Sequence, residues 1–190
     1  MKKKIITIAL IVSLVAVAAV GSNAYFTAAE KATNVITSGS VKIDLLEMSV
    51  PADGKPVPFE DVSGVMPGAS VSKVVTVRNT GDNAAWVRVS VGKAIALREG
   101  VTGEPDLSLV RFDLNSENWT EHDGYYYYNT ALEPGAETEP LFTAVTFAAE
   151  MGNMYQESTA TVTVLAQATQ LVHNGSSAIE AAGWPAETEG

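Results

Sequence analysis

The sequence predicts an all-β protein, a jelly-roll-like two-sheet sandwich with one or two short helices. Nearly every periodic segment after residue 24 alternates apolar and polar residues with period two, the pattern of half-buried strands. These segments are short and are joined by turns of Gly, Pro and Asn, as in sandwiches and jelly rolls. A layered α/β fold would need helices between its strands, and helical periodicity is scarce.

The first 24 residues are typical of a secretory signal peptide. Three lysines precede an apolar run over residues 5–20, and small residues follow it. We expect cleavage after Ala24, with Ser22 two positions earlier and Tyr25 first in the mature chain; cleavage after position 28 or 29 is an alternative. A retained membrane anchor is the other alternative, but the run of 16 residues is shorter than the roughly 20 that span a bilayer.

The amino-acid composition limits the kinds of partner and chemistry that we expect for this chain. The signal peptide holds three of the 12 basic residues and none of the 22 acidic ones, so the mature chain has nine cations and a net charge of −13. Duplex binding needs clustered Lys and Arg, and these cations are scattered singly, so we expect no nucleic-acid partner. The chain has no cysteine, which excludes thiol catalysis and Cys-ligated zinc.

The chain divides into four parts on these signals. Residues 1–24 are the signal peptide, and residues 25–39 are an N-terminal arm that we expect to form a strand. Residues 40–185 are the sandwich domain, and residues 186–190 are a flexible acidic tail. We expect the mature protein to be secreted, in an extracellular matrix or at the cell surface, and to contact a membrane only before cleavage.

The first strand of the domain alternates clearly. Val41, Ile43 and Leu45 point one way, and Lys42 and Asp44 point the other. This pattern predicts a strand with its valine, isoleucine and leucine side chains in the core.

Residues 70–78 and 87–91 are the next two predicted strands. The first places Val71, Val75 and Val77 on one face, with a break at Lys73 and Val74, and the second alternates without a break. Turn residues fill positions 79–83 between them, so the pair predicts a β-hairpin with a loop of four or five residues.

Two further strands and three ambiguous segments complete the domain. Residues 141–147 predict a strand with apolar groups on both faces, and residues 159–169 predict a long strand with one wet face. Residues 95–99 either form a helical turn or end a strand, residues 107–112 are ambiguous, and residues 176–182 suit two helical turns before Gly and Pro stop them.

Two Pro-Gly pairs precede strands, Pro67-Gly68 and Pro134-Gly135. Proline presets one φ and glycine takes the positive φ of a type II turn, so both predict strand-entry turns. The alternative interpretation of this repeated Pro-Gly pattern is an internal duplication of the sequence.

No catalytic, metal or cofactor site is predicted. His122 and His173 are the only histidines, and neither belongs to a His-Glu-x-x-His helix. Glu121, His122 and Asp123 are consecutive, and neighbours on a strand point to opposite faces, so they predict a solvated loop. Serine-hydrolase elbows, phosphate loops and EF-hand spacings are absent from the sequence.

Aromatic residues suggest a contact surface. Trp119 lies shortly before a row of four tyrosines, Tyr125, Tyr126, Tyr127 and Tyr128, which would place two rings on each face of a strand. Exposed Tyr and Trp stack on sugars or anchor a protein contact. Tyrosines also suit strands as packing residues, and we favour that interpretation.

A set of short motifs spans most of the chain. They are Ala24-Tyr25-Phe26, Asn34-Val35-Ile36 with Gly39 and the strand after it, Met66-Pro67-Gly68, residues 75–81, residues 86–89, Leu132-Glu133-Pro134-Gly135, and the strand at 160–168 with Trp184. Together these motifs resemble the TasA and camelysin (CalY) family of exported proteins.

This resemblance implies a jelly-roll subunit of extracellular fibres, in a biofilm matrix or on a cell or spore surface. It implies processing by a SipW-type signal peptidase and assembly with itself or with related matrix subunits. Family members are similar in joining through donor strands, which makes Tyr25, Phe26, Asn34, Val35, Ile36 and Gly39 the candidate assembly residues. The sequence independently allows this, because strand addition satisfies open backbone groups at a sheet edge.

Two other functions stay open at this stage. The camelysin name implies a surface metalloprotease, although the two separate histidines are a poor ligand set for zinc. A monomeric carbohydrate-binding or adhesin module on the same sandwich would use Trp119 and the tyrosine row.

Overall fold

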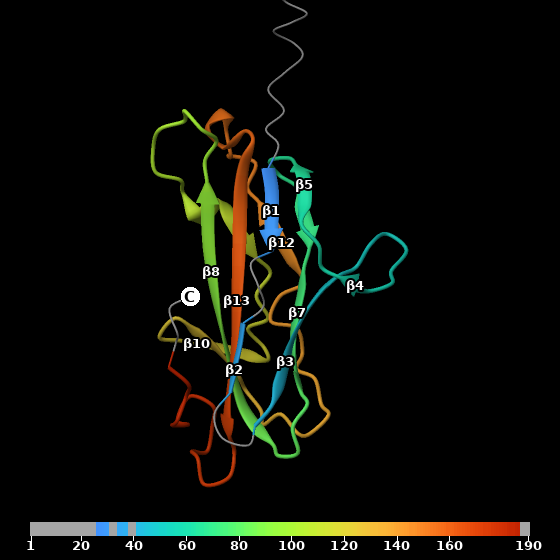
Figure 1. Cartoon of the computed structure of the whole chain (residues 1–190), viewed down its shortest axis with the longest axis vertical. Coiled ribbons are helices and arrows are strands. Elements are labelled where there is room, and N and C mark those ends of the chain that lie inside the picture. The colour runs from blue at the N-terminus through green and yellow to red at the C-terminus, as the bar shows by residue number, and fades with distance from the viewer. Residues whose placement is uncertain (1–25, 31–33, 38–40, 187–190) are drawn as a thin grey trace, which may run out of the picture.

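The computed structural model describes residues 26–30, 34–37 and 41–186, and these form an elongated, all-β molecule (Figure 1). The large sheet has seven strands. Six follow the order β10-β11-β8-β13-β1-β5, and β2 lies beside β13. Its strands are β1 (Phe26–Glu30), β2 (Asn34–Thr37), β5 (Val62–Val65), β8 (Ala85–Ala96), β10 (Trp119–His122), β11 (Tyr125–Tyr128) and β13 (Ser158–Gln170).

Two three-stranded sheets complete the fold. The β3 sheet has the order β4-β3-β7, with β4 (Val57–Pro58), β3 (Ile43–Ser49) and β7 (Val74–Asn79). The β12 sheet has the order β6-β12-β9, with β6 (Ser70–Ser72), β12 (Ala144–Phe147) and β9 (Val110–Phe112). Helical structure in the described residues consists of two 3-10 turns, η1 (Leu107–Leu109) and η2 (Asn153–Tyr155).

One apolar core joins all three sheets, as the sandwich prediction requires. Val87 and Val164 of the large sheet belong to the same buried cluster as Val77 of the β3 sheet and Phe147 of the β12 sheet. The predicted alternation holds at its start, where Val41, Ile43 and Leu45 are buried and their intervening neighbours are exposed. The all-β sandwich is therefore confirmed.

Lys73 lies between strands β6 and β7, where the chain passes from one small sheet to the other. Its burial explains why the predicted alternation of residues 70–78 breaks at this position. Its ammonium lies 2.7 Å from Glu47 Oε1, and the two side chains are only 3% and 5% exposed. The same ammonium lies 3.8 Å from the centre of the Phe59 ring. A charged residue occupies the core here because an opposite charge and an aromatic face compensate for lost water.

The predicted hairpin of residues 70–78 and 87–91 is wrong. β7 pairs with β3, and β8 pairs with β13 and β11, so the two strands belong to different sheets. Turn residues at 79–83 allow the chain to reverse, but they do not decide which strand pairs with which. Here Asn79 holds the turn by donating to the carbonyls of Asn83 and Leu132, at 2.9 and 2.8 Å.

The other element predictions have mixed outcomes. The long strand is confirmed as β13. The prediction that one of its faces is exposed to solvent is wrong at Gln167 and Thr169, which are buried. The strand predicted at 141–147 begins only at Ala144. Residues 95–99 end strand β8 at Ala96, and residues 107–112 form η1 followed by β9. No helix forms at 176–182, where the chain makes turns.

Both Pro-Gly pairs form the predicted turns. The Ala69 amide donates to the Met66 carbonyl at 3.0 Å, and Gly68 has φ +80°. The Ala136 amide donates to the Glu133 carbonyl at 3.0 Å, and Gly135 has φ +77°. A side chain at either glycine would strain this backbone, which is why glycine follows proline at both places.

Candidate assembly site

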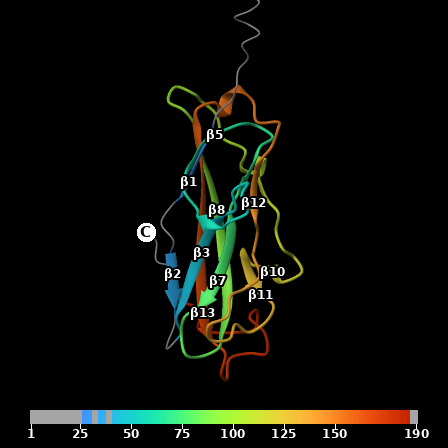
Figure 2. The ribbon, with the colours of Figure 1, turned by 90° about the vertical axis from the view of Figure 1, so that its right-hand side faces the viewer.

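The N-terminal arm is built into the large sheet. β1 pairs in parallel with β13, from Phe26 opposite Ser158 to Glu30 opposite Val162. β2 continues along the same edge of β13, from Asn34 opposite Leu165 to Thr37 opposite Ala168. Figures 1 and 2 show the two short strands lying one beyond the other beside β13.

β1 is an interior strand of the sheet, although it is the first strand of the chain. Its second edge pairs antiparallel with β5, with Phe26 opposite Val65 and Ala28 opposite Val62. β13 and β5 are therefore the two walls of a slot that β1 fills. The walls themselves run antiparallel to each other, since one is parallel and the other antiparallel to β1.

The two ends of the molecule are distinct, and we call them the base and the top. At the base, the Lys42 carbonyl accepts from the amides of Thr80 and Gly81, and Gln170 at the end of β13 pairs with Ala85. The top holds the start of β13 at Ser158 and the end of β8. The arm thus runs from Phe26 at the top toward the base, where the domain begins (Figure 1).

Part of the predicted site lies outside the described residues. This applies to the signal peptide, to the cleavage residues Ser22, Ala24 and Tyr25, and to Gly39 of the arm. The backbone positions of Phe26, Asn34, Val35 and Ile36 are described, and the last three lie in β2.

Trp119 is not available as a surface contact. Its side chain is 3% exposed, its indole N–H donates to the Glu139 carbonyl at 3.0 Å, and its ring lies 5.0 Å from the Tyr128 ring. Local sequence patterns do not predict this burial, because the carbonyl that accepts from the indole comes from Glu139, twenty residues further along.

The tyrosine row is divided between the two faces of the sheet: Tyr125 and Tyr127 lie under the C-terminal segment, and Tyr126 and Tyr128 pack against the main core. Tyr127 is buried, and Tyr125, Tyr126 and Tyr128 are partly buried. Arg88 stacks over the Tyr125 ring at 3.8 Å and over the Trp184 ring at 4.6 Å. Residues 171–186 therefore pack on the outer face of the large sheet, which is also why Gln167 and Thr169 are buried.

Hydrogen bonds fix this C-terminal segment in place. Trp86 Nε1 donates to the Asn174 carbonyl at 2.8 Å, and Thr169 Oγ1 donates to the Ala182 carbonyl at 3.0 Å. Gln167 accepts from Arg88 Nε at 2.7 Å and donates to the Pro185 carbonyl at 3.2 Å. These bonds place the C-terminal segment over the part of the outer face that carries Gln167 and Thr169.

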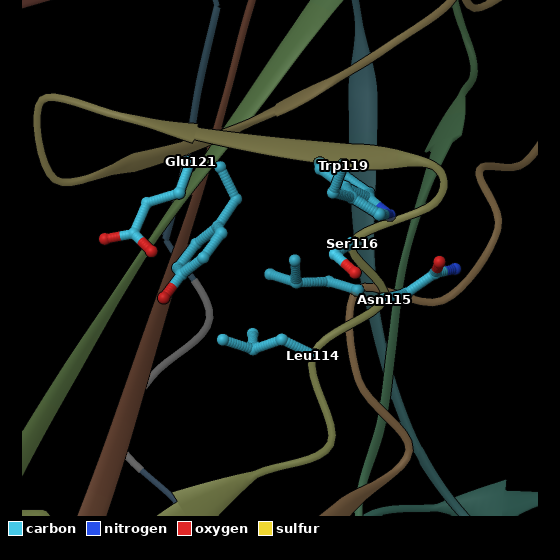
Figure 3. Close-up of a pocket in the computed structure, with 7 residues that line it drawn as sticks. Leu114, Asn115, Ser116, Trp119 and Glu121 are labelled. Atoms are coloured by element: carbon cyan, nitrogen blue, oxygen red, sulfur yellow. The ribbon is translucent and has the colours of Figure 1, made fainter.

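A small hollow lies beside the β10–β11 hairpin (Figure 3). Its volume is about 80 Å³, well below the roughly 300–1,000 Å³ of small-molecule sites. Burial, with the nearby Glu121 carboxylate, raises the pKa of the Tyr126 phenol in its wall. Its lining residues are Leu114, Asn115, Ser116, Trp119, Glu121, Tyr126 and Leu141.

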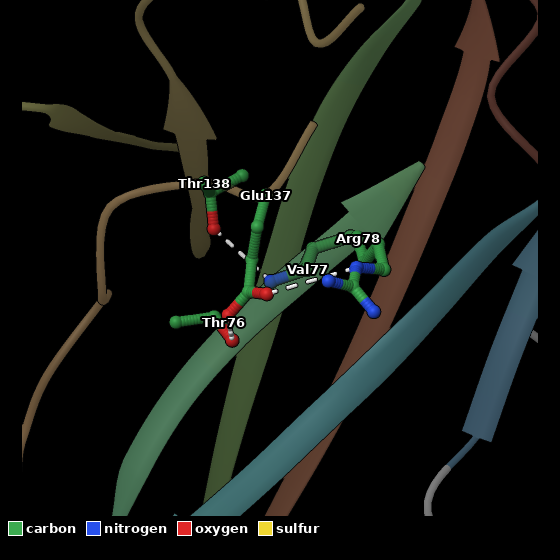
Figure 4. A network of polar contacts seen from close by, with 5 residues as sticks. All are labelled: Thr76, Val77, Arg78, Glu137 and Thr138. Carbon is green, nitrogen blue, oxygen red and sulfur yellow. Dashed lines mark hydrogen bonds and ion pairs between the residues drawn. The ribbon is translucent and has the colours of Figure 1, made fainter. Parts of the chain in front are cut away.

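The edge of strand β7 is also covered by another segment of the chain, but in a different way from the edge of β13. Residues 132–141 run along β7, and Thr138 and Val77 exchange two bonds, one through the Thr138 hydroxyl at 3.0 Å and one through its amide at 2.9 Å. Thr76 Oγ1 donates to Glu137 at 2.6 Å, and Arg78 lies 3.8 Å from the same carboxylate (Figure 4). Side chains as well as backbone groups therefore hold this internal segment.

The histidines stand apart from each other. Glu121 and His122 are exposed, as predicted, but they end strand β10 and do not lie in a loop. His122 Nε2 lies 3.2 Å from Asp123, and His173 adopts a φ of +57° in the C-terminal segment. Among the described residues, no three His, Asp or Glu side chains gather as metal ligands. In the same part of the chain, no helix is long and apolar enough to cross a membrane.

Sequence reasoning identified one wall of the slot, β13, and missed the other, β5. β5 carries only Val62 and Val65 as apolar residues, too short a pattern to predict a strand. The alternation of β13 was visible in the sequence, but its pairing with a strand some 130 residues earlier leaves no local signal.

Comparison with known proteins adds no relative: no protein-family model, curated protein or solved structure matches the chain.

Proposed function

We propose that this protein is a secreted structural subunit of extracellular fibres, in a biofilm matrix or a cell- or spore-surface layer, which assembles by donating its N-terminal arm. In this proposal the arm of one subunit leaves its own slot and fills the slot of another. The partners are further copies of the chain or related matrix subunits. The resemblance of residues 24–45 to the TasA and camelysin family favours the same function.

The observation that carries the proposal is the interior position of β1. A first strand at a sheet edge would expose one new edge on leaving, but β1 leaves two, on β13 and on β5. Unpaired strand edges bind any available strand of suitable length. A second copy of the arm has the same backbone and the same side chains, so it is a suitable occupant.

Removal of the signal peptide would control assembly. We expect a SipW-type peptidase to cut after Ala24, which leaves the arm attached to the domain only through residues 38–40. Before the cut, the arm would be held at both ends, by the membrane-bound signal peptide and by the domain. A strand held at both ends cannot thread into another molecule, so cleavage would release it.

The acidic charge of the mature chain sets the conditions for assembly. Copies with a net charge of −13 repel one another, and low pH or added salt weakens that repulsion. The arm in its own slot also competes with exchange, because the tether gives it an effective concentration of about millimolar order. We therefore expect slow assembly that is fastest at high protein concentration and acidic pH.

The proposal is tested with full-length mature protein that carries Ala28→Pro. Ala28 pairs with both walls, and proline lacks the N–H of an interior strand. Electron microscopy and light scattering should show fibres for the unmodified mature protein and none for the proline variant. Ala28→Ser keeps the N–H and a small side chain, so it serves as the matched control and should assemble.

Two results would refute strand donation. One is fibre formation by Ala28→Pro at the rate of the control. The other is an unmodified mature protein that stays monomeric at high concentration and acidic pH.

A further inference from the structure

We infer that the arm reverses its direction when it is exchanged, so that it lies parallel to β13 of its own subunit and antiparallel to β13 of the next. This inference rests on the proposed strand donation and specifies its geometry. The base of one copy would then stack on the top of the next, and the interaction surface would be formed by those two ends.

The short connection between arm and domain limits where a donor can stand. Thr37 lies beside Ala168 near the base, and Val41 begins the domain at that same base. The chain between these two residues spans at most about 14 Å. Wherever the arm goes, its Thr37 end must therefore stay close to the base of the donor.

Exchange with unchanged direction would bring two bases together. The Thr37 end of the arm would lie beside Ala168 of the acceptor, at the acceptor's base. The donor's base would then be within reach of that point. Two copies in this arrangement fill each other's slots around a two-fold axis and close as a dimer, which offers no slot for further growth.

Exchange with reversed direction produces an open chain of subunits. The arm would leave the base of the donor, enter the acceptor at its top, and place Phe26 toward the acceptor's base. Each subunit then presents one empty slot and one free arm at opposite ends. Such head-to-tail contacts continue without closing, as a fibre requires.

The slot accepts both directions because its walls are antiparallel to each other. An arm strand in either direction is parallel to one wall and antiparallel to the other. β13 has 13 residues and β5 has four, so the wall that pairs antiparallel changes from the short one to the long one on reversal. Antiparallel pairing is the more stable kind per residue, which favours the reversed arm.

Exposed apolar side chains lie at both ends. Met66, which follows Val65 at the top of the slot, is 43% exposed. Val172, which follows Leu171 beside the Ala84 carbonyl at the base, is 61% exposed. Stacking of base on top would cover both, and joining of two bases would leave Met66 in water.

Engineered disulfides distinguish the two directions, since the chain has no cysteine of its own. Ala29 lies opposite Thr161, and Asn34 lies opposite Leu165. In an arm reversed about its centre, these partners are interchanged, and Ala29 meets Leu165 while Asn34 meets Thr161. The alternatives differ by four residues, or about 13 Å along the strand, which exceeds the reach of a disulfide.

Four double variants are needed, pairing cysteine at 29 or 34 with cysteine at 161 or 165. Each mature protein is assembled, oxidised mildly and analysed on a denaturing gel. The inference predicts ladders of covalent oligomers for Ala29→Cys with Leu165→Cys and for Asn34→Cys with Thr161→Cys. The same oxidation of unassembled monomer should instead close Ala29→Cys with Thr161→Cys within one chain, which checks the observed register.

The remaining outcomes separate the inference from the proposed function. Covalent oligomers only from the pairs 29 with 161 and 34 with 165 would overturn the reversal and leave strand donation standing. Fibres in which none of the four pairs links two chains would refute both. A mature protein and variants that never assemble would also refute both.

Discussion

Two strand edges of this molecule are covered by segments from elsewhere in the chain, and the two coverings differ. The arm covers β13 by strand pairing, and Glu30 is the one charged residue in its two strands. Residues 132–141 cover β7 with backbone bonds and with the Glu137 and Thr138 side chains. The second segment also continues into the fold at both of its ends.

The difference shows how one sandwich can hold a fixed edge and an exchangeable one. Backbone pairing is the same in every copy of a chain, so an arm held by it transfers between copies without a change in chemistry. Side-chain bonds depend on exact placement, and a segment anchored at both ends cannot leave without unfolding its neighbours. Mutations in the fixed part should therefore lower global stability, and mutations in the arm should mainly change assembly.

The largest effect should come from the buried ion pair in the fixed part. Glu47→Ala leaves the Lys73 ammonium, 3% exposed, without its counter-charge. We expect the free energy of unfolding to fall by about 3–5 kcal/mol. Chemical denaturation measures this, and the double variant Glu47→Ala with Lys73→Met should recover much of the loss. If the double variant loses as much free energy of unfolding as Glu47→Ala, packing and not the charge pair stabilises this part of the core.

A smaller effect is expected at the turn that follows strand β7. Asn79 is fully buried, and its side chain donates to two carbonyls and accepts from the Gly81 amide. Asn79→Ala leaves these groups without their partner, which should cost about 2–3 kcal/mol. The midpoint of urea unfolding reports this change. A loss below about 0.5 kcal/mol would mean that water replaces the side chain, as it does at an exposed site.

Asp113 makes part of the fixed region sensitive to acid. Burial alone would raise the pKa of its carboxyl, but hydrogen bonds from Thr143 and Ala144 outweigh this and lower the pKa below its ordinary value. A lowered pKa means that the carboxylate stabilises the fold above about pH 4 and that this contribution disappears as the pH falls further.

Asp113→Asn should therefore lower stability by about 1 kcal/mol at pH 7, since the site is largely exposed to water. The difference between the two proteins should shrink as the pH falls below 4. Thermal unfolding at pH 7, 4 and 2.5 measures both. A difference that stays constant over that range would contradict the assignment to the carboxylate charge.

The smallest effect on stability is expected in the arm. Ala28→Pro removes a backbone donor from β1, but because the arm opens locally, the free energy of unfolding of the monomer should fall by less than about 1 kcal/mol. Far-ultraviolet circular dichroism and urea unfolding of the monomer measure this change beside Ala28→Ser. A loss comparable to that of Glu47→Ala would place the arm among the fixed parts of the fold.

The sequence predicted elements better than their partners. Alternation over residues 159–169 identified β13, and Pro67 and Pro134 identified two turns, because these signals are local. The predicted hairpin around residues 79–83 is wrong because turn residues allow the chain to reverse but do not determine which strands pair. The slot depends on a strand that pairs with residues far along the chain, and the burial of Gln167 depends on the C-terminal segment. Contacts between distant segments are the part that local periodicity does not encode.

The central claim is that the arm leaves its slot while the rest of the fold stays intact. Native-state hydrogen exchange of the monomer, followed residue by residue at low denaturant, tests this most directly. We predict that the backbone amides of β1 exchange through a local opening, at a lower free energy than those of Val77 and Leu141 at the fixed edge. If the β1 amides exchange only with global unfolding, at the same free energy as that edge, the arm is a permanent strand and the account is wrong.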